Sequence, residues 1–263
     1  MSSGHLRTGV LFIVKTKSTR KEVNSNITSN RKRLLNNNSP FAIKEAYVKL
    51  RTGLMFCMTA SKERACKTFA VTSAMPSEGK SLTVANIAIS FAMLGKRVML
   101  IDADMRKPAQ RRLWNVKENT GLCDFLARLG ALGISKVADL PLWLVCVGTI
   151  PPNPSELLTS DRMKIFVETC AKHYDYVIID TPPINTVADA QIISTYVDGT
   201  LLVAKSGRAT ADGLNMAIEA IQRAEGNLCG VVLNDLNMKS VKYSYKYKYG
   251  DKYGYDYSSH DEA

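Results

Sequence analysis

Two patterns of hydrophobic and polar positions alternate along this chain. Short apolar runs rich in β-branched residues predict strands at 68–73, 97–101, 142–147, 176–179, 200–204 and 228–233. Apolar residues at helical spacing lie between them, at about 80–94, 121–129, 160–172, 187–197 and 210–225. This alternation predicts right-handed crossovers and a doubly wound, mostly parallel sheet of the α/β class.

A further helix is predicted ahead of the first strand, over about 40–57. Ser39 and Pro40 are typical of an N-cap and a first helical residue, and apolar residues at helical spacing follow them. With 263 residues and 46% hydrophobic content, the chain has material for one substantial core. We therefore expect a single domain at 39–238, between a leader at 1–38 and a tail at 239–263.

The formal net charge of +11 is concentrated at one end, because residues 1–40 carry eight Lys or Arg against one acid. This stretch is also rich in Asn and Ser, which predicts a flexible, solvated arm; attraction to an anionic membrane surface or an acidic partner is the alternative. The apolar stretch at 9–14 is far shorter than the roughly 20 residues that span a membrane. Six single cysteines without a C-x-x-C spacing, and no signal peptide, predict a cytoplasmic protein.

The first predicted strand leads through SAMPSEGKS, at 73–81, into a helix. Gly79, Lys80 and Ser81 complete a P-loop pattern whose opening glycine is replaced by Ala74. Backbone N–H groups at a helix N-terminus suit a phosphate, the lysine ammonium suits its outer oxygens, and the serine hydroxyl suits Mg²⁺. Asn234, at the end of GVVLND, is a candidate for the base edge of a nucleotide, although Asn-Asp after a strand is also ordinary turn chemistry. The other candidate nucleotide-binding residues are Ser77, Glu78, Gly79, Lys80, Ser81 and Leu82.

Acidic residues end two further predicted strands. Asp102 and Asp104 lie two residues apart in VMLIDADMRKP, and Asp180 ends the apolar run of YVIIDTPP. Beside a phosphate site, one such carboxylate can hold Mg²⁺ while another accepts the proton of an incoming hydroxyl. Asp180 has the position of a Walker B aspartate, which holds the metal directly or through water. We expect Arg106, with Lys107 beside it, to offset charge on a transferred phosphoryl group.

Seven of the eleven tyrosines lie between Lys242 and Ala263. They are Tyr243, Tyr245, Tyr247, Tyr249, Tyr253, Tyr255 and Tyr257. The run suits a terminal β-hairpin, a tail that stacks on nucleic-acid bases, or a substrate. A lone hairpin is marginal in water, and five Lys against four acids after position 238 leave only +1 for binding a phosphate backbone. We therefore expect no nucleic-acid partner, and the third alternative, a substrate, stays open at this point.

These motifs together resemble the bacterial protein-tyrosine kinases of capsule and exopolysaccharide synthesis, in the form where the kinase is a separate cytosolic chain. The resemblance covers about 39–257, and its most specific elements are the D-x-D-x-R stretch and the tyrosine tail. It implies an enzyme that uses ATP and Mg²⁺ to phosphorylate its own tail tyrosines, between subunits of a homo-oligomer, and that regulates polysaccharide synthesis and export. It also implies docking on the cytosolic tail of a transmembrane polysaccharide co-polymerase, at the inner face of the membrane, and a phosphotyrosine phosphatase as a further partner.

The same resemblance implies roles for individual residues. Lys80 would bind phosphates, while Ser81, Asp104 and Asp180 would bind Mg²⁺. Asp102 is the favoured base toward tyrosine, although spacing alone leaves both Asp102 and Asp104 open.

One motif departs from the family pattern. The family's oligomerisation helix tends to show E-x-x-R-x-x-R, and Val48 replaces the middle arginine here. Glu45 and Arg51 remain the candidate oligomer-interface residues, able to pair between subunits.

The partitioning and division-site ATPases have a similar core and act as ATP-gated dimers on DNA or membrane, so they are the rival class. They carry a signature lysine directly after the first residue of the P-loop pattern, and Met75 stands at that position here. Met75 and the tyrosine tail together favour the kinase.

Overall fold

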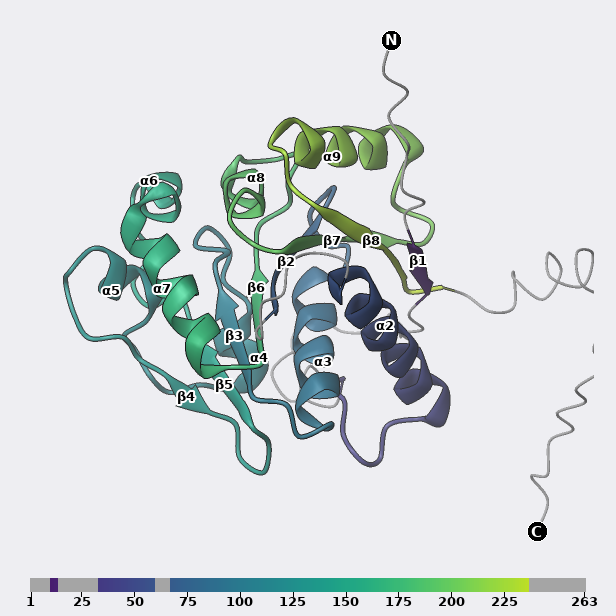
Figure 1. Cartoon of the computed structure of the whole chain (residues 1–263), viewed down its shortest axis with the longest axis horizontal. Helices are drawn as coiled ribbons and strands as arrows, with labels where there is room; N and C mark the ends of the chain where they lie inside the picture. Colours follow the sequence, from purple (N-terminus) through teal and green to yellow (C-terminus); the bar gives the residue numbers. More distant parts are fainter. Residues whose placement is uncertain (1–9, 14–32, 60–66, 237–263) are drawn as a thin grey trace, which may run out of the picture.

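The computed structural model of the chain describes residues 10–13, 33–59 and 67–236. Within these ranges eight strands form one sheet (Figure 1). Their spatial order is β1 (Val10–Ile13), β8 (Leu228–Asn234), β7 (Gly199–Lys205), β2 (Lys67–Ser73), β6 (Tyr176–Asp180), β3 (Val98–Asp102), β5 (Leu142–Val145) and β4 (Ser135–Lys136). Neighbouring strands pair in parallel except β4, which is antiparallel to β5. The predicted doubly wound α/β fold is confirmed.

Helices cover both faces of this sheet (Figure 1). One face packs against α2 (Phe41–Thr59) and α3 (Lys80–Ala92). The other face packs against α5 (Leu122–Leu126), α7 (Asp161–His173), α8 (Asp189–Ser194) and α9 (Ala211–Arg223). Two short helices without a sequence signal, α4 (Gln110–Trp114) and α6 (Pro154–Thr159), follow β3 and β5.

The central strands explain why the polar residues gather at one edge. Every residue of β3 and β6 is buried, as expected for parallel strands that are covered on both faces. β6 lies between β2 and β3, and Asp102 pairs in register with Asp180. The P-loop after β2 and the acids at the ends of β3 and β6 therefore meet at the carboxyl edge of the sheet, where such folds bind ligands.

The fold begins earlier than the sequence predicted. β1, within the expected flexible arm, pairs in parallel with β8. Leu34 and Leu35 are buried in the same core as α2 and α3, and the Leu35 N–H donates to Asn86 Oδ1 at 2.8 Å. A uniformly flexible leader at 1–38 is therefore wrong for these residues, because an apolar run too short to cross a membrane is long enough for an edge strand.

Two expectations lie outside the described residues: the boundary of the tail at 239 and the seven tail tyrosines as substrates. Of the helices that the structure describes, none has both the length and the apolar character that crossing a membrane requires.

Replacing Leu35 with Ala should lower the free energy of unfolding by about 2–3 kcal/mol, because a buried leucine is truncated in a packed core. Urea unfolding measures this. Asn37→Ala, at an exposed position of the same segment, is the control and should change stability by less than about 0.5 kcal/mol. Equal stability of both variants would contradict a role for Leu35 in the core and would support a folded unit that begins at position 39.

Candidate active site

The P-loop is a turn between β2 and α3 that the sequence forces into unusual backbone angles. Ser77 and Gly79 have φ values of +67° and +87°. A Cβ on Gly79 would lie 2.1 Å from Asn234 Nδ2, so glycine is required for both its angle and its space. Gly79 is the N-cap of α3, and its carbonyl accepts a bond from Thr83 Oγ1 at 3.0 Å.

Two predicted nucleotide-binding side chains support this turn from behind. Glu78 is fully buried and accepts the N–H groups of Met75 at 2.9 Å and Lys205 at 3.4 Å. Asn234 Nδ2 donates to the Glu78 carbonyl at 2.9 Å, and its Oδ1 accepts from the Asp235 N–H. Glu78 can therefore reach a phosphate only through its backbone. The sequence suggested that Asn234 contacts the base of a nucleotide, but in the structure its side chain binds the P-loop backbone.

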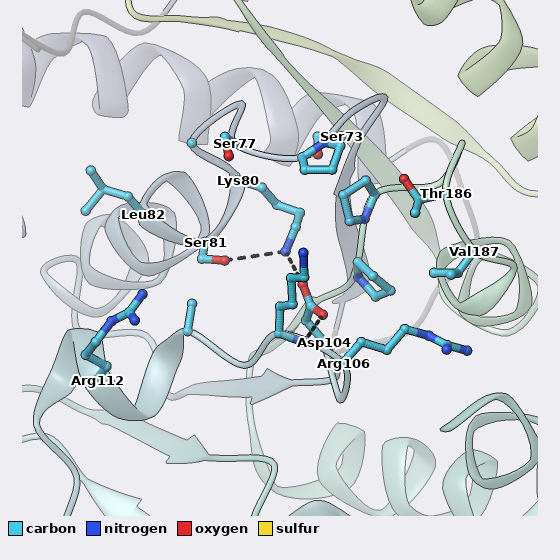
Figure 2. Close-up of a pocket in the computed structure, with 16 residues that line it drawn as sticks. Ser73, Ser77, Lys80, Ser81, Leu82, Asp104, Arg106, Arg112, Thr186 and Val187 are labelled. Carbon is cyan, nitrogen blue, oxygen red and sulfur yellow. Dashed lines mark hydrogen bonds and ion pairs between the residues drawn. The ribbon is translucent and has the colours of Figure 1, made fainter. Parts of the chain in front are cut away.

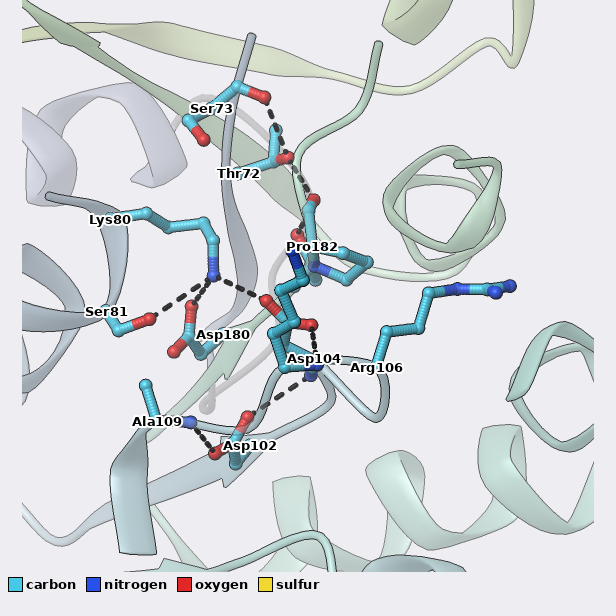
Figure 3. Close-up of polar contacts among 12 residues, drawn as sticks. Thr72, Ser73, Lys80, Ser81, Asp102, Asp104, Arg106, Ala109, Asp180 and Pro182 are labelled. Atoms are coloured by element: carbon cyan, nitrogen blue, oxygen red, sulfur yellow. Dashed lines mark hydrogen bonds and ion pairs between the residues drawn. The ribbon is translucent and has the colours of Figure 1, made fainter. Parts of the chain in front are cut away.

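Three predicted catalytic residues meet around one buried ion pair (Figure 3). Lys80 Nζ lies 2.5 Å from Asp180 Oδ1 and 3.5 Å from Asp104 Oδ2. Ser81 Oγ lies 3.4 Å from the same nitrogen. Burial disfavours the charge on Lys80, but the two carboxylates outweigh it and raise its pKa. The lysine therefore remains a cation at the floor of the site.

Asp102 lies behind this ion pair rather than beside it. Its carboxylate is fully buried and accepts the N–H groups of Asp104 at 3.2 Å, Ala109 at 3.2 Å and Gln110 at 2.9 Å. Burial and then the charge of Asp180 raise the pKa of Asp102 to about 8. Burial also raises the pKa of Asp104, which lies nearer the surface of the site.

Gln110 is the site residue that sequence reasoning missed. Its Nε2 donates to Asp180 Oδ2 at 2.7 Å and to the Ser81 carbonyl at 3.0 Å, so it connects two predicted metal ligands. Trp114 Nε1 donates to Gln110 Oε1 at 3.0 Å and fixes the amide orientation. The only sequence signal was position, since Gln110 lies four residues after the D-x-D-x-R stretch.

Arg106 has a different partner from the one expected. Its guanidinium makes an ion pair with the buried Asp189 of α8, with Nε 2.9 Å from Oδ2, and also donates to Ser155 Oγ at 3.1 Å. Figure 3 shows its side chain directed away from Lys80. In this arrangement Arg106 joins the D-x-D-x-R loop to α8 and α6 and does not offset charge beside Lys80.

A cavity of about 400 Å³ opens above these groups (Figure 2); we call it the nucleotide cavity. Its walls come from the P-loop, from the segment after β3 and from the segment after β6. The lining residues are Ser73, Pro76, Ser77, Gly79, Lys80, Ser81, Leu82, Asp104, Arg106, Lys107, Ala109, Arg112, Pro182, Pro183, Thr186 and Val187. Asp102 and Asp180 lie beneath this lining, while Asp104 contributes to it.

The donor chemistry fits Mg²⁺ bound together with a phosphorylated ligand. Ser81, Asp104 and Asp180 supply hard oxygen atoms around Lys80, and Mg²⁺ prefers one or two carboxylates plus phosphate oxygens and water. In the part of the chain that the structure describes, no group of three His, Cys, Asp or Glu side chains forms a metal site unaided. Phosphate oxygens would therefore have to complete the coordination.

The predicted interface pair lies apart on α2. Arg51 Nη1 donates within the same chain to the Ser90 carbonyl at 2.6 Å and to Ser90 Oγ at 3.2 Å. Arg51 thus ties α2 to α3, and pairing with a second subunit would require it to leave that partner. The side chain of the half-buried Glu45 makes no hydrogen bond or ion pair with another described residue.

Fold and site together define a P-loop nucleotide-binding protein, and comparison with known proteins gives its family. The family model described as the CobQ/CobB/MinD/ParA nucleotide binding domain matches residues 69–246. Tyrosine-protein kinase YwqD of Bacillus subtilis is 41% identical over 205 residues, which cover 76% of this chain and 85% of that protein.

Two solved structures are similar over nearly the whole domain. The chimerical protein CapA2B2 has a TM-score of 0.75 and 31% identity, covering 87% of this chain and 95% of that chain. The kinase domain of Escherichia coli tyrosine kinase ETK has a TM-score of 0.74 and 29% identity, covering 95% of each chain. The chain belongs to the CobQ/CobB/MinD/ParA nucleotide-binding family and, within it, to the bacterial protein-tyrosine kinases of capsule and exopolysaccharide synthesis. It is a protein-tyrosine kinase.

Replacing Gln110 with Glu should lower the kinase rate at least tenfold. The new carboxylate would face Asp180 in place of an amide donor, and a hydrogen bond to a charged group contributes about 1.5–3 kcal/mol. Initial rates with Mg-ATP measure the effect, with thermal unfolding as a check on folding. Gln222→Glu, on the exposed face of α9, is the matched control; equal rates for both variants would contradict a role for Gln110.

Proposed function

We propose that the chain transfers the γ-phosphoryl group of ATP to the tyrosines of its own tail, between subunits, and thereby regulates capsule or exopolysaccharide synthesis and export. The observation that carries this proposal is the buried Lys80, held between Asp180 and Asp104 at the floor of a cavity open to solvent. Such a site supplies phosphate binding, metal ligands and a carboxylate acceptor for a phenolic proton, and the sequence adds a tail containing seven tyrosines.

The proposed chemistry is an in-line displacement. The tyrosine oxygen forms a bond to the γ-phosphorus while the bond from that phosphorus to the β,γ-bridging oxygen breaks, and ADP leaves. Lys80 and the P-loop N–H groups hold the phosphates in place. When bound, Mg²⁺ would supply positive charge against the phosphate oxygens, held by Ser81, Asp104 and Asp180.

The phenolic proton must pass to a carboxylate, and two acids compete for that role. Asp104 lines the nucleotide cavity, which favours it for direct contact with the incoming hydroxyl. Asp102 is fully buried and already accepts three backbone N–H groups. Its assignment as the base stays a prediction, and it requires Asp102 to be ionised and the loop around it to open.

Two partners are part of the proposal. The cytosolic tail of a transmembrane polysaccharide co-polymerase would recruit the kinase to the inner face of the membrane and activate it, and a phosphotyrosine phosphatase would reverse the modification. The alternative, an ATP-gated partitioning or division-site switch, has less support, because Met75 stands where that class carries its signature lysine and is half exposed.

Incubating the full chain with Mg-ATP and the partner's cytosolic segment should place phosphate on tyrosines between Tyr243 and Tyr257, as read by mass spectrometry. Lys80→Met should reduce the yield by roughly a hundredfold or more, because a cation aimed at the transferred group is lost. Lys172→Met, at an exposed position of α7, is the matched control and should retain activity.

Mixing two variants of the chain distinguishes phosphoryl transfer between subunits from transfer within one subunit. Kinase whose seven tail tyrosines are replaced by Phe should phosphorylate the intact tail of Lys80→Met chains. An unmodified tail in the wild-type chain, under the activating conditions, would refute the tail as substrate. Asp102→Asn and Asp104→Asn, compared in the same assay, identify the base.

A further inference from the structure

A second cavity of about 370 Å³ adjoins the nucleotide cavity, and none of the recognised motifs accounts for it. It lies between α4 and the segment after β5. Its lining residues are Pro108, Arg111, Arg112, Asn115, Val116, Val147, Gly148 and Ile150. Arg112 lines both cavities, so the two share a wall. Figure 2 shows Arg112 projecting from α4 at the margin of the nucleotide cavity.

The two arginines are the only charged residues in this lining, and no acid accompanies them. The segment after α4 orients the Arg111 side chain, because its Nε donates to the Val116 carbonyl at 3.4 Å and its Nη2 donates to Asn119 Oδ1. The Arg112 side chain is exposed and makes no hydrogen bond or ion pair with any residue that the structure describes. The guanidinium of Arg111 is held in place and that of Arg112 has no described partner. Together they offer several N–H donors to an anion, and guanidinium geometry matches phosphate oxygens.

The remaining wall of the second cavity is largely apolar. Pro108, Val116, Val147 and Ile150 supply hydrocarbon surface next to the arginines. A ligand that satisfies both parts carries a flat apolar body and a dianionic end. Phosphotyrosine has this structure, with a charge of about −1.5 to −2 on the end of an aromatic ring.

The spacing of the tail tyrosines would bring such a ligand close to the nucleotide cavity. Tyr243, Tyr245, Tyr247 and Tyr249 occur at every second position, and an extended chain advances about 3.3 Å per residue. With one tyrosine at the nucleotide cavity, the next tyrosine on the same side is therefore about 7 Å away along the chain. Because Arg112 lines both cavities, we expect neighbouring tyrosines of one extended segment to reach both.

We propose that the second cavity binds a phosphotyrosine already formed in the tail of another copy of this chain, through Arg111 and Arg112, while a neighbouring tyrosine occupies the nucleotide cavity. This inference rests on the proposed tail phosphorylation and adds substrate selection to it. The product of one transfer becomes a binding group for the next, so a partly phosphorylated tail is preferred over an unphosphorylated one.

The test compares two peptides spanning residues 242–257, one with phosphotyrosine and one with Phe at position 247, so that both offer the same acceptor tyrosines. The kinase is the full chain with its seven tail tyrosines replaced by Phe, which removes competition from its own tail. We expect a KM roughly tenfold lower for the phosphorylated peptide at similar kcat, because two guanidinium groups gain a dianionic partner. Arg111→Gln combined with Arg112→Gln should bring the ratio of the two KM values close to one.

Lys117→Gln is the matched control, since Lys117 is exposed near α4 but lines neither cavity; it should keep the preference. Equal KM values in the chain with both arginines would overturn the inference, as would a preference that survives the double variant. A double variant that raises the KM for ATP and leaves the peptide ratio unchanged would assign the arginines to the nucleotide and also overturn it. Absence of any transfer to the Phe-containing peptide would instead count against tail phosphorylation itself.

Discussion

The buried ion pair between Lys80 and Asp180 is the constraint on which the rest of the site depends. Taking two opposite charges out of water is costly, and the pair is stable only when its remaining hydrogen-bonding capacity is used. Asp104 and Ser81 share the ammonium, and Gln110 holds the second oxygen of Asp180. The strand order makes this possible, because β6 delivers its acid between the P-loop after β2 and the aspartates after β3.

Those residues that belong to the strands or the P-loop turn could be predicted from the sequence. Apolar runs ending in Asp102 and Asp180, and a lysine at a strand-to-helix turn, place charged groups at one edge of a parallel sheet by topology alone. That prediction needed no knowledge of side-chain contacts. The structure confirms the sheet and brings Asp104 and Asp180 within 3.5 Å of the Lys80 ammonium.

The rest of the site could not be predicted because it depends on contacts between segments distant in sequence. Arg106 pairs with Asp189, eighty-three positions away, and Asn234 bonds to the P-loop carbonyl of Glu78. Gln110 lies in a five-residue helix too short to give a periodic signal. The leader was misjudged for a similar reason, since the pairing of β1 with β8 is invisible in a local pattern.

Acidic and basic side chains lie at different places around the nucleotide cavity. Acids beneath the nucleotide cavity would hold a metal and accept a proton, while cations from α4 and the loop before it stand at its entrance. Lys107 and Arg112 line that cavity, and Arg111 and Arg112 line the next one. In this arrangement Asp104 and Asp180 would supply carboxylates for Mg²⁺ around Lys80, and the arginines of α4 would supply cations for phosphorylated substrates.

Unfolding of the metal-free Lys80→Met chain at two pH values tests the central ion pair most directly. Removing one member of a buried pair leaves an uncompensated charge and costs about 3 kcal/mol or more. Burial and the charge of Asp180 raise the pKa of Asp102 to about 8, so this acid takes up a proton between the two pH values. Less negative charge is then left unpaired when the lysine is removed. The account predicts a loss of about 3 kcal/mol relative to wild type at pH about 8.5, and less than half of that at pH about 5.5. Equal losses at both pH values, or none at the higher one, would contradict it.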